Sequence, residues 1–166
     1  MPKVELVAAT REIELLKIEK LMQFYMYDVS EWLPLPFGDD GSFFIRPKAE
    51  YWSHAGTHAF FIAVDGETAG FATVDTDVVD ADTSFSIGYF FVSRRFRGTG
   101  AGSKAAEILL QRFPGTWQIF HVNANDGARR FWEKIVSRLS KGEFAKRTQE
   151  IDGYDCLLYK FRQTER

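Results

Sequence analysis

Three glycines at alternate positions, Gly98, Gly100 and Gly102, form the segment of the sequence best suited to chemistry. They follow an apolar stretch and precede a helical pattern, an order that points backbone N–H groups at one concavity beside a helix dipole. Four basic residues add local positive charge: Arg94, Arg95, Arg97 and Lys104. The segment therefore predicts a phosphate-binding loop. The alternative is an ordinary helix start, which the entropic cost of ordering three glycines disfavours.

Two common glycine loops can be tested against the same residues. The P-loop of nucleoside triphosphatases has a lysine directly after its last glycine, whereas Ser103 separates Gly102 from Lys104. A dinucleotide fold has an acidic residue at the end of the strand after the loop, but the apolar stretch here ends Ile119-Phe120-His121. Both spacings disfavour a nucleotide-binding protein, which stays a minor alternative.

Length and composition restrict the class of protein. A chain of 166 residues with 45% apolar content suits one domain over residues 1–166. The formal net charge of −2 gives no basic excess for nucleic acid, and residues 1–14 lack the apolar run of a signal peptide or membrane helix. Cys156 is the sole cysteine, which excludes an internal disulfide and suits a reducing compartment. We therefore expect a cytoplasmic protein with no nucleic-acid or membrane partner.

Periodic apolar residues predict the elements that must position the loop. Val4–Ala8 is expected to be a strand, and Thr10 to cap a helix whose apolar face holds Leu15, Ile18, Met22 and Met26. Later strands are expected over His58–Val64, Thr68–Val74, Phe85–Val92 and Thr116–Val122, with a last hairpin of Glu143–Glu150 and Cys156–Phe161. Helices are expected over Ser103–Phe113 and Asp126–Leu139. The glycine loop thus joins a strand to a helix.

The segment Tyr25–Phe44 contains Pro34, Pro36, Gly38 and Gly41, which forbid a continuous helix. Long ordered loops in compact domains are often functional, so we interpret this segment as a wall of a substrate site. A packed surface loop is the equally weighted alternative.

The segment Arg97-Gly98-Thr99-Gly100-Ala101-Gly102 resembles the Arg/Gln-x-x-Gly-x-Gly/Ala signature of the GNAT acyltransferase superfamily. Asn125-Asp126-Gly127-Ala128 is similar to the Asn-x-x-Ala pattern that opens a later helix of that family, and the order of elements from Val4 to Phe161 resembles its layout. The resemblance implies an α/β (α+β) GNAT fold: a mixed, mostly antiparallel sheet with a splayed central strand pair and helices on both faces. It also implies an N-acetyltransferase with acetyl-CoA as co-substrate. The run Phe24-Tyr25-Met26-Tyr27-Asp28 resembles a subgroup of bacterial acetyltransferases.

The resemblance also implies which residues hold acetyl-CoA. Backbone amides of the loop would bind the pyrophosphate, the strand before it would contact the thioester carbonyl, and the later helix would line the pantetheine arm. The residues implied are Phe90, Phe91, Val92, Arg97, Gly98, Thr99, Gly100, Ala101, Gly102, Ser103, Lys104, Asn125, Ala128 and Phe131. Simple helix packing is the alternative role of Ala128 and Phe131.

The catalytic groups are less well defined. Many relatives carry a tyrosine seven residues after the helix-opening asparagine, but Trp132 stands there and its indole cannot supply a proton. Tyr89, Tyr25, Tyr27 or water then become the candidate acids. The strand before the loop contains no acid, so His121 becomes the candidate base, with a core histidine as the alternative.

The expected acceptor is a primary amine of an unidentified small molecule or peptide. Aromatic and acidic residues that would suit a cationic amine gather in one stretch: Tyr25, Tyr27, Asp28, Glu31 and Trp32. Direct transfer is expected, because no histidine adjoins Cys156 in the sequence. We expect no metal site, since neither the His54 and His58 pair nor the aspartates from Asp75 to Asp82 match a metal motif. A non-catalytic acyl-CoA-binding module is the main alternative, and open sheet edges would permit a homodimer.

Overall fold

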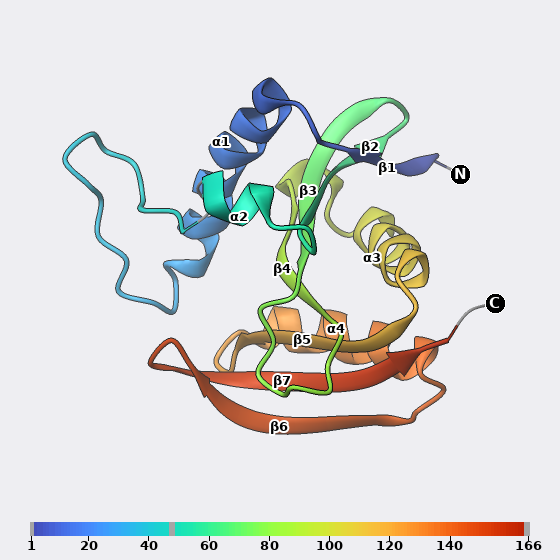
Figure 1. Ribbon diagram of the computed structural model, residues 1–166. Helices are drawn as coiled ribbons and strands as arrows, with labels where there is room; N and C mark the ends of the chain where they lie inside the picture. The colour runs from blue at the N-terminus through green and yellow to red at the C-terminus, as the bar shows by residue number, and fades with distance from the viewer. Residues whose placement is uncertain (1, 47–48, 165–166) are drawn as a thin grey trace.

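The computed structural model describes residues 2–46 and 49–164, which form one mixed sheet with helices on both faces (Figure 1). The strands are β1 (Val4–Ala8), β2 (His58–Val64), β3 (Glu67–Asp75), β4 (Phe85–Val92), β5 (Gly115–Val122), β6 (Phe144–Ile151) and β7 (Tyr154–Gln163). The helices are α1 (Glu12–Val29), α2 (Ala49–Ser53), α3 (Ala101–Arg112), α4 (Asp126–Leu139) and a 3₁₀ turn, η1 (Arg94–Phe96). The strand order is β1-β2-β3-β4-β5-β7-β6, and all neighbours are antiparallel except β4 and β5. The predicted fold class is confirmed.

The sheet is covered on both faces, so its central strands alternate between two cores. In β2, Phe60 and Ile62 face a cluster that includes α3 and α4, whereas Ala59 and Phe61 face a cluster built on α1. This explains why β2 is a nearly continuous apolar run. Its hairpin to β3 turns at Asp65 and Gly66, whose φ angles of 50° and 83° suit the two-residue turn expected from an Asp-Gly pair.

The central parallel strands β4 and β5 touch over only a short length. Their register contains two residue pairs, Phe85 with Trp117 and Ser86 with Gln118. Beyond them β4 stays paired with β3 and β5 with β7, while the two strands diverge (Figure 1). The edges that face each other across this opening therefore lack a strand partner over most of their length, which is the expected splay.

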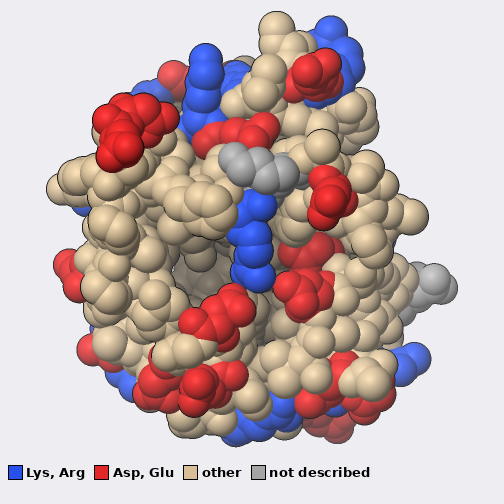
Figure 2. Space-filling view, turned by 60° about the vertical axis from the view of Figure 1, so that its left-hand side comes forward, with Lys and Arg blue, Asp and Glu red and all other residues tan. Residues whose placement is uncertain are grey.

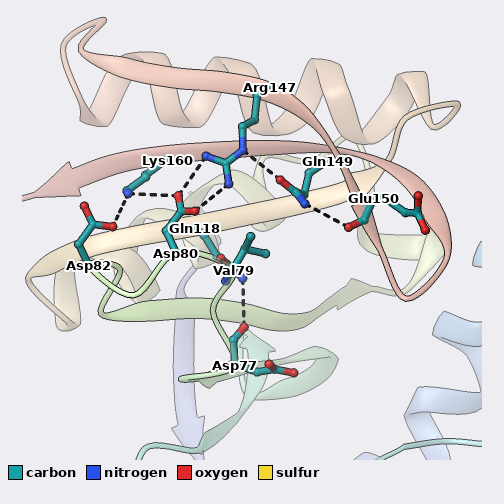
Figure 3. A network of polar contacts seen from close by, with 9 residues as sticks. All are labelled: Asp77, Val79, Asp80, Asp82, Gln118, Arg147, Gln149, Glu150 and Lys160. Atoms are coloured by element: carbon teal, nitrogen blue, oxygen red, sulfur yellow. Dashed lines mark hydrogen bonds and ion pairs between the residues drawn. The ribbon is translucent and has the colours of Figure 1, made fainter.

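A buried amide closes the narrow end of the splay. Gln118 is 2% exposed, accepts a hydrogen bond from the Val79 N–H at 2.9 Å, and donates to the Asp77 carbonyl at 3.1 Å and the Ser86 hydroxyl at 3.0 Å. One side chain of β5 thus holds both β4 and the connection that precedes it, as Figure 3 shows for Val79 and Asp77.

A second set of contacts fastens the same connection to the outer hairpin (Figure 3). Asp80 accepts hydrogen bonds from two Arg147 nitrogens at 2.9 and 3.0 Å and from Lys160 at 3.2 Å, and Lys160 also bonds Asp82. Hydrogen bonds from Arg147, and then from Lys160, lower the pKa of Asp80 to about 2. The contacts therefore persist well into the acid range.

The start of α1 differs from the sequence-based expectation. Arg11, rather than Thr10, is the N-cap residue, and the helix begins at Glu12. The Glu14 carboxylate reaches back to accept hydrogen bonds from the backbone N–H groups of Arg11 at 3.0 Å and Thr10 at 3.3 Å. An acid in the first turn also suits the positive end of the helix dipole, so Glu14 stabilises the start of the helix without the threonine hydroxyl.

Two further differences concern the segment after this helix. The helix continues to Val29, so Tyr25, Tyr27 and Asp28 lie in its last turns rather than in the loop. The short helix α2 was not expected, because five residues are too few to show a helical period. No helix within residues 2–46 and 49–164 is both long and apolar enough to cross a bilayer.

Replacing Gln118 by leucine tests the amide at the narrow end. Gln118→Leu keeps the volume but leaves the Ser86 hydroxyl and the Val79 N–H without this partner, and each such group costs about 1–3 kcal/mol. We expect the free energy of unfolding to fall by about 2–4 kcal/mol in urea titrations and the melting temperature by about 5–12 °C. Gln149→Leu, on the outer hairpin, is the matched control. Equal stability of the two variants would contradict this role.

Candidate functional site

The glycine loop lies where β4 leads into α3. Gly98 and Gly100 have φ angles of 74° and 87°, a left-handed conformation that favours glycine, and no atom lies within 4 Å of where their Cβ atoms would be. Gly100 is the N-cap of α3, whose first-turn N–H groups have no partner within the helix. The loop thus has open space beside two of its glycines at the start of α3, and its binding of phosphate stays a prediction.

The arginines around this loop are engaged by acidic side chains. Arg97 donates to Asp28 at 2.5 Å and, through Nε, to the Val92 carbonyl at 2.7 Å, while Arg94 lies 3.6 Å from the same aspartate. Arg95 is paired with Glu67. The local positive charge is therefore partly balanced, and Asp28 ties the end of α1 to the loop.

A cleft of about 540 Å³ fills the opening between β4 and β5; we call it the main cleft. Its walls include Gly88, Tyr89 and Phe90 of β4, His121 of β5 and the start of α4. In α4 the Asn125 side chain accepts a hydrogen bond from the Ala128 N–H at 2.9 Å, so this asparagine caps the helix. The start of α4 thus forms one wall of the main cleft.

Aromatic rings bridge the main cleft at its α4 side. Phe90 packs against Phe131 and Trp132, with ring centroids 5.7 and 5.1 Å away. Trp132 is 6% exposed and lines the cleft. The side chains of Phe91 and Val92 pack in the two cores, on opposite faces of the sheet.

A β-bulge interrupts β4 at Gly88. Thr73 pairs with Tyr89 and Val74 with Ile87, so Gly88 has no partner in β3, and the Thr73 hydroxyl accepts the Tyr89 N–H at 3.0 Å. A Cβ at Gly88 would collide with Asp75, Thr73 and Tyr51. A glycine inside an apolar strand is the sequence signal that could have revealed this feature.

A second cavity of about 350 Å³, the side pocket, opens beside α2. It is lined by Asp75 at the end of β3, by Tyr51 of α2, and by Arg46, Glu50 and Asp77. The molecule is hollowed on the face that Figure 2 shows, with acidic and basic side chains at the rim. Sequence reasoning did not single out Tyr51, since nothing in its local pattern marks it.

His121 is held as a neutral imidazole. Its Nδ1 lies 2.8 Å from the Val122 carbonyl, which can only accept, so Nδ1 carries the proton and Nε2 accepts from the Tyr159 hydroxyl at 2.9 Å. Burial lowers the pKa of His121, and the bond to Val122 opposes this in part. The residue lines the main cleft, but its basic nitrogen already has a donor.

Two tyrosines meet on the α1 side of the main cleft. Tyr25 and Tyr89 stack edge to face with centroids 5.2 Å apart, and burial raises the pKa of each. Cys156, which lies far away in the sequence, also lines the main cleft, and burial raises the pKa of its thiol. A thiol kept protonated is a weak nucleophile.

The residues predicted to bind the acceptor do not all come together. Tyr25 and Trp32 line the main cleft. Tyr27 is 60% exposed, Glu31 is exposed, and Asp28 turns to the arginines of the loop. The loop after α1 is held in place because the Gln23 amide bonds the N–H and carbonyl of Phe43 at 2.7 and 2.9 Å.

Fold and site together define a GNAT-type acyltransferase. A family model of the acetyltransferase (GNAT) family matches residues 22–136. The chain belongs to this family. Within residues 2–46 and 49–164, no group of three His, Cys, Asp or Glu side chains is placed to hold a metal ion.

Solved structures show the same fold. An acetyltransferase from Salmonella typhimurium that modifies the N-terminal serine of a 50S ribosomal subunit protein is 15% identical, with a TM-score of 0.61 over 96% of this chain and 95% of that one. The ribosomal-protein-alanine N-acetyltransferase of Escherichia coli is 14% identical, with a TM-score of 0.56 over 100% and 96%. A ribosomal alpha-N-protein acetyltransferase in complex with coenzyme A is 15% identical, with a TM-score of 0.58 over 96% and 94%. No curated protein matches the sequence at a significant level.

The state of His121 can be tested by removing its donor. In Tyr159→Phe the hydroxyl that stabilises the neutral ring is lost, so we expect the pKa of His121 to rise toward its ordinary value. NMR titration of the His121 ring measures this directly, and Tyr154→Phe on the same strand is the control.

The pH dependence of the free energy of unfolding gives a second measure of the neutral state of His121. Because the folded pKa of His121 lies below its unfolded value, wild-type stability falls as the pH drops through about 6.5 toward the folded pKa. This pH dependence should weaken in Tyr159→Phe. An unchanged His121 titration would show that the hydroxyl does not hold the neutral ring.

Proposed function

We propose that this acetyltransferase moves the acetyl group of acetyl-CoA to a primary amine, by direct transfer within a ternary complex. The observation that carries the proposal is the opening between β4 and β5 with the glycine loop at its end. A thin, polar arm ending in a phosphate group fits this shape, because it can replace the missing strand and place its anion on the loop.

The phosphate end of acetyl-CoA is assigned to residues 97–104. Gly98 and Gly100 adopt left-handed conformations that would let backbone groups face a bound phosphate. The first turn of α3 adds N–H groups and the positive end of the helix dipole. Thr99 is held by its bond to the Phe96 carbonyl at 2.5 Å, which fixes the loop from within. Lys104, exposed in the first turn of α3, supplies further positive charge.

The pantetheine arm is assigned to the cleft edge of β4 and to the start of α4. Backbone groups from Phe90 to Val92 that point away from β3 lie along the opening and can pair with the amides of the arm. Asn125, Ala128 and Phe131 would lie on its other side. The thioester supplies an activated acyl group when it is bound.

Direct transfer is favoured over a covalent intermediate. Cys156 is the only cysteine of the sequence, and it lines the main cleft. Burial raises the pKa of its thiol, so the thiol stays protonated near neutral pH. Nucleophilic catalysis requires the thiolate. The acyl group is therefore proposed to pass straight to the amine.

The acceptor is proposed to be an amine of a small molecule or a peptide. Three of the similar structures are acetyltransferases of ribosomal proteins, one of them for an N-terminal serine. At about 15% identity they support an amine acceptor only through the shared fold. A non-catalytic acyl-CoA-binding module is the second candidate, which the packed Trp132 favours because indole cannot donate a proton.

A matched pair of glycine variants tests the ligand. Gly100→Asp puts a carboxylate on the phosphate loop, whereas Gly142→Asp puts one at an equally open position with a similar φ, 82° against 87°. At about one hundred times its dissociation constant, acetyl-CoA adds about 2.7 kcal/mol to the wild type and raises the melting temperature by about 5–10 °C. We expect Gly142→Asp to keep this shift and Gly100→Asp to lose it.

Controls with ATP and NAD separate this ligand from other phosphates. A shift with either nucleotide but not with CoA would overturn the assignment of the loop. Thiol release from acetyl-CoA with a panel of amines then distinguishes the enzyme from the binding module, since only the enzyme exceeds the hydrolysis background.

A further inference from the structure

We propose that the side pocket binds the ammonium group of the acceptor and that Asp75 is the catalytic base that takes its proton. This inference rests on the proposed acetyl transfer and adds to it a base and a substrate class, a cationic alkylamine. The sequence contains no acid within the strand before the glycine loop, and the structure brings one there from the neighbouring strand.

Asp75 is a buried carboxylate in the wall of the pocket. It is 6% exposed, and its oxygens accept hydrogen bonds from the Tyr51 hydroxyl at 2.7 Å and from the Asp77 N–H at 3.1 Å. No ion pair of Asp75 occurs among the residues that the structure describes. A buried acid with donors but no cation is suited to receive one from a ligand.

The bulge in β4 gives Asp75 access to the reacting groups. A Cβ at Gly88 would collide with Asp75 Oδ2, so the carboxylate lies directly over the glycine. Gly88 and Tyr89 line both the side pocket and the main cleft, as do Arg46 and Phe120. An amine held at Asp75 therefore lies at the junction of the two cavities, next to the edge of β4 to which the pantetheine arm is assigned.

The charges of the pocket favour a cation. Three carboxylates line it, those of Glu50, Asp75 and Asp77, against the guanidinium of Arg46. Arg46 lies 3.7 Å from Asp77 and 3.3 Å from Asp152, so its charge is already engaged. The rings of Tyr51 and Tyr89 add faces that attract an ammonium group.

Burial makes Asp75 a better base than an exposed aspartate. Desolvation raises its pKa, while the hydrogen bond from Tyr51 and that from the Asp77 N–H limit the rise. A base works best when its pKa approaches the working pH. His121 is less suited, because its unprotonated ring nitrogen, Nε2, already accepts a hydrogen bond from the Tyr159 hydroxyl.

The proton and electron balance is complete with acetyl-CoA and the amine alone. The alkylammonium ion gives one proton to Asp75, and the nitrogen lone pair forms a C–N bond with the thioester carbon. The C–S bond breaks, the sulfur takes the second proton from nitrogen, and the amide and CoA thiol leave. Asp75 then releases its proton to water.

Asp75→Asn tests the role, because asparagine keeps the size of the side chain and can still accept from Tyr51. With 1,4-diaminobutane as acceptor, we expect kcat/KM to fall about 100-fold or more. With aniline, which is already neutral at pH 7.5, the loss should be no more than about threefold. Asp82→Asn, an exposed acid in the connection that follows β3, is the control and should keep wild-type rates.

Tyr51→Phe provides a second, independent readout. Removing the donor should raise the pKa of Asp75, so the acid limb of the pH profile of kcat/KM moves to higher pH. The other charged or titratable groups that line the side pocket are Arg46, Glu50, His54, Asp77 and Tyr89, and all remain in this variant. An unmoved limb would argue against Asp75 as the titrating base.

The outcomes separate the two proposals. A folded Asp75→Asn that still gains thermal stability from acetyl-CoA, yet retains its rate with 1,4-diaminobutane, overturns Asp75 as the base and leaves acetyl transfer intact. A wild type that prefers acidic or neutral amines overturns the cation pocket. If the wild type binds acetyl-CoA but none of the tested amines raises thiol release above the hydrolysis background, the transfer function is overturned. The assignment of Asp75 as its base is then overturned as well.

Discussion

The loss of hydrogen bonds between β4 and β5 is the constraint on which the rest of the molecule depends. Two paired residues join these strands, and beyond them each edge must find other partners for its N–H and C=O groups. Such a gap in a sheet is stable only if its narrow end is fixed and its walls are supported. Gln118 fixes the narrow end with three hydrogen bonds. The walls are supported by two hydrophobic cores, one packed on α1 and the other on α3 and α4.

The same opening organises the chemistry on its two sides. The start of α4 lines the main cleft on one side, whereas the end of α1 and the loop after it line it on the other, and α2 lines the adjoining side pocket. The main cleft and the side pocket meet at the bulge, because Gly88 has neither a side chain nor a pairing partner in β3. Groups contributed by distant parts of the chain thus meet at one short stretch of strand.

Local patterns predicted most of the fold and the glycine loop between a strand and a helix, and non-local contacts account for what was missed. Strands such as Phe85–Val92 and the Asp-Gly turns depend on neighbouring residues, so the sequence shows them directly. Asp75 and Gly88 become neighbours only through strand pairing with a bulge, which no periodicity reveals. Asp28 was expected to face an acceptor. Its carboxylate instead accepts a hydrogen bond from Arg97 of the glycine loop, which is 69 residues away in the sequence.

The fixed end of the splay also has a mechanical consequence. The backbones of the half-sheet β1 to β4 and the half-sheet β5 to β7 meet through two residue pairs, with Gln118 and the Asp80 contacts beside them, and one hydrophobic core packs against both. A change in the angle between the half-sheets would alter the width of the wedge without breaking any ladder of either half-sheet. Resistance to such a change then falls on that shared core and on the packed rings of Phe90, Phe131 and Trp132, apolar contacts that can slide where hydrogen bonds would have to break.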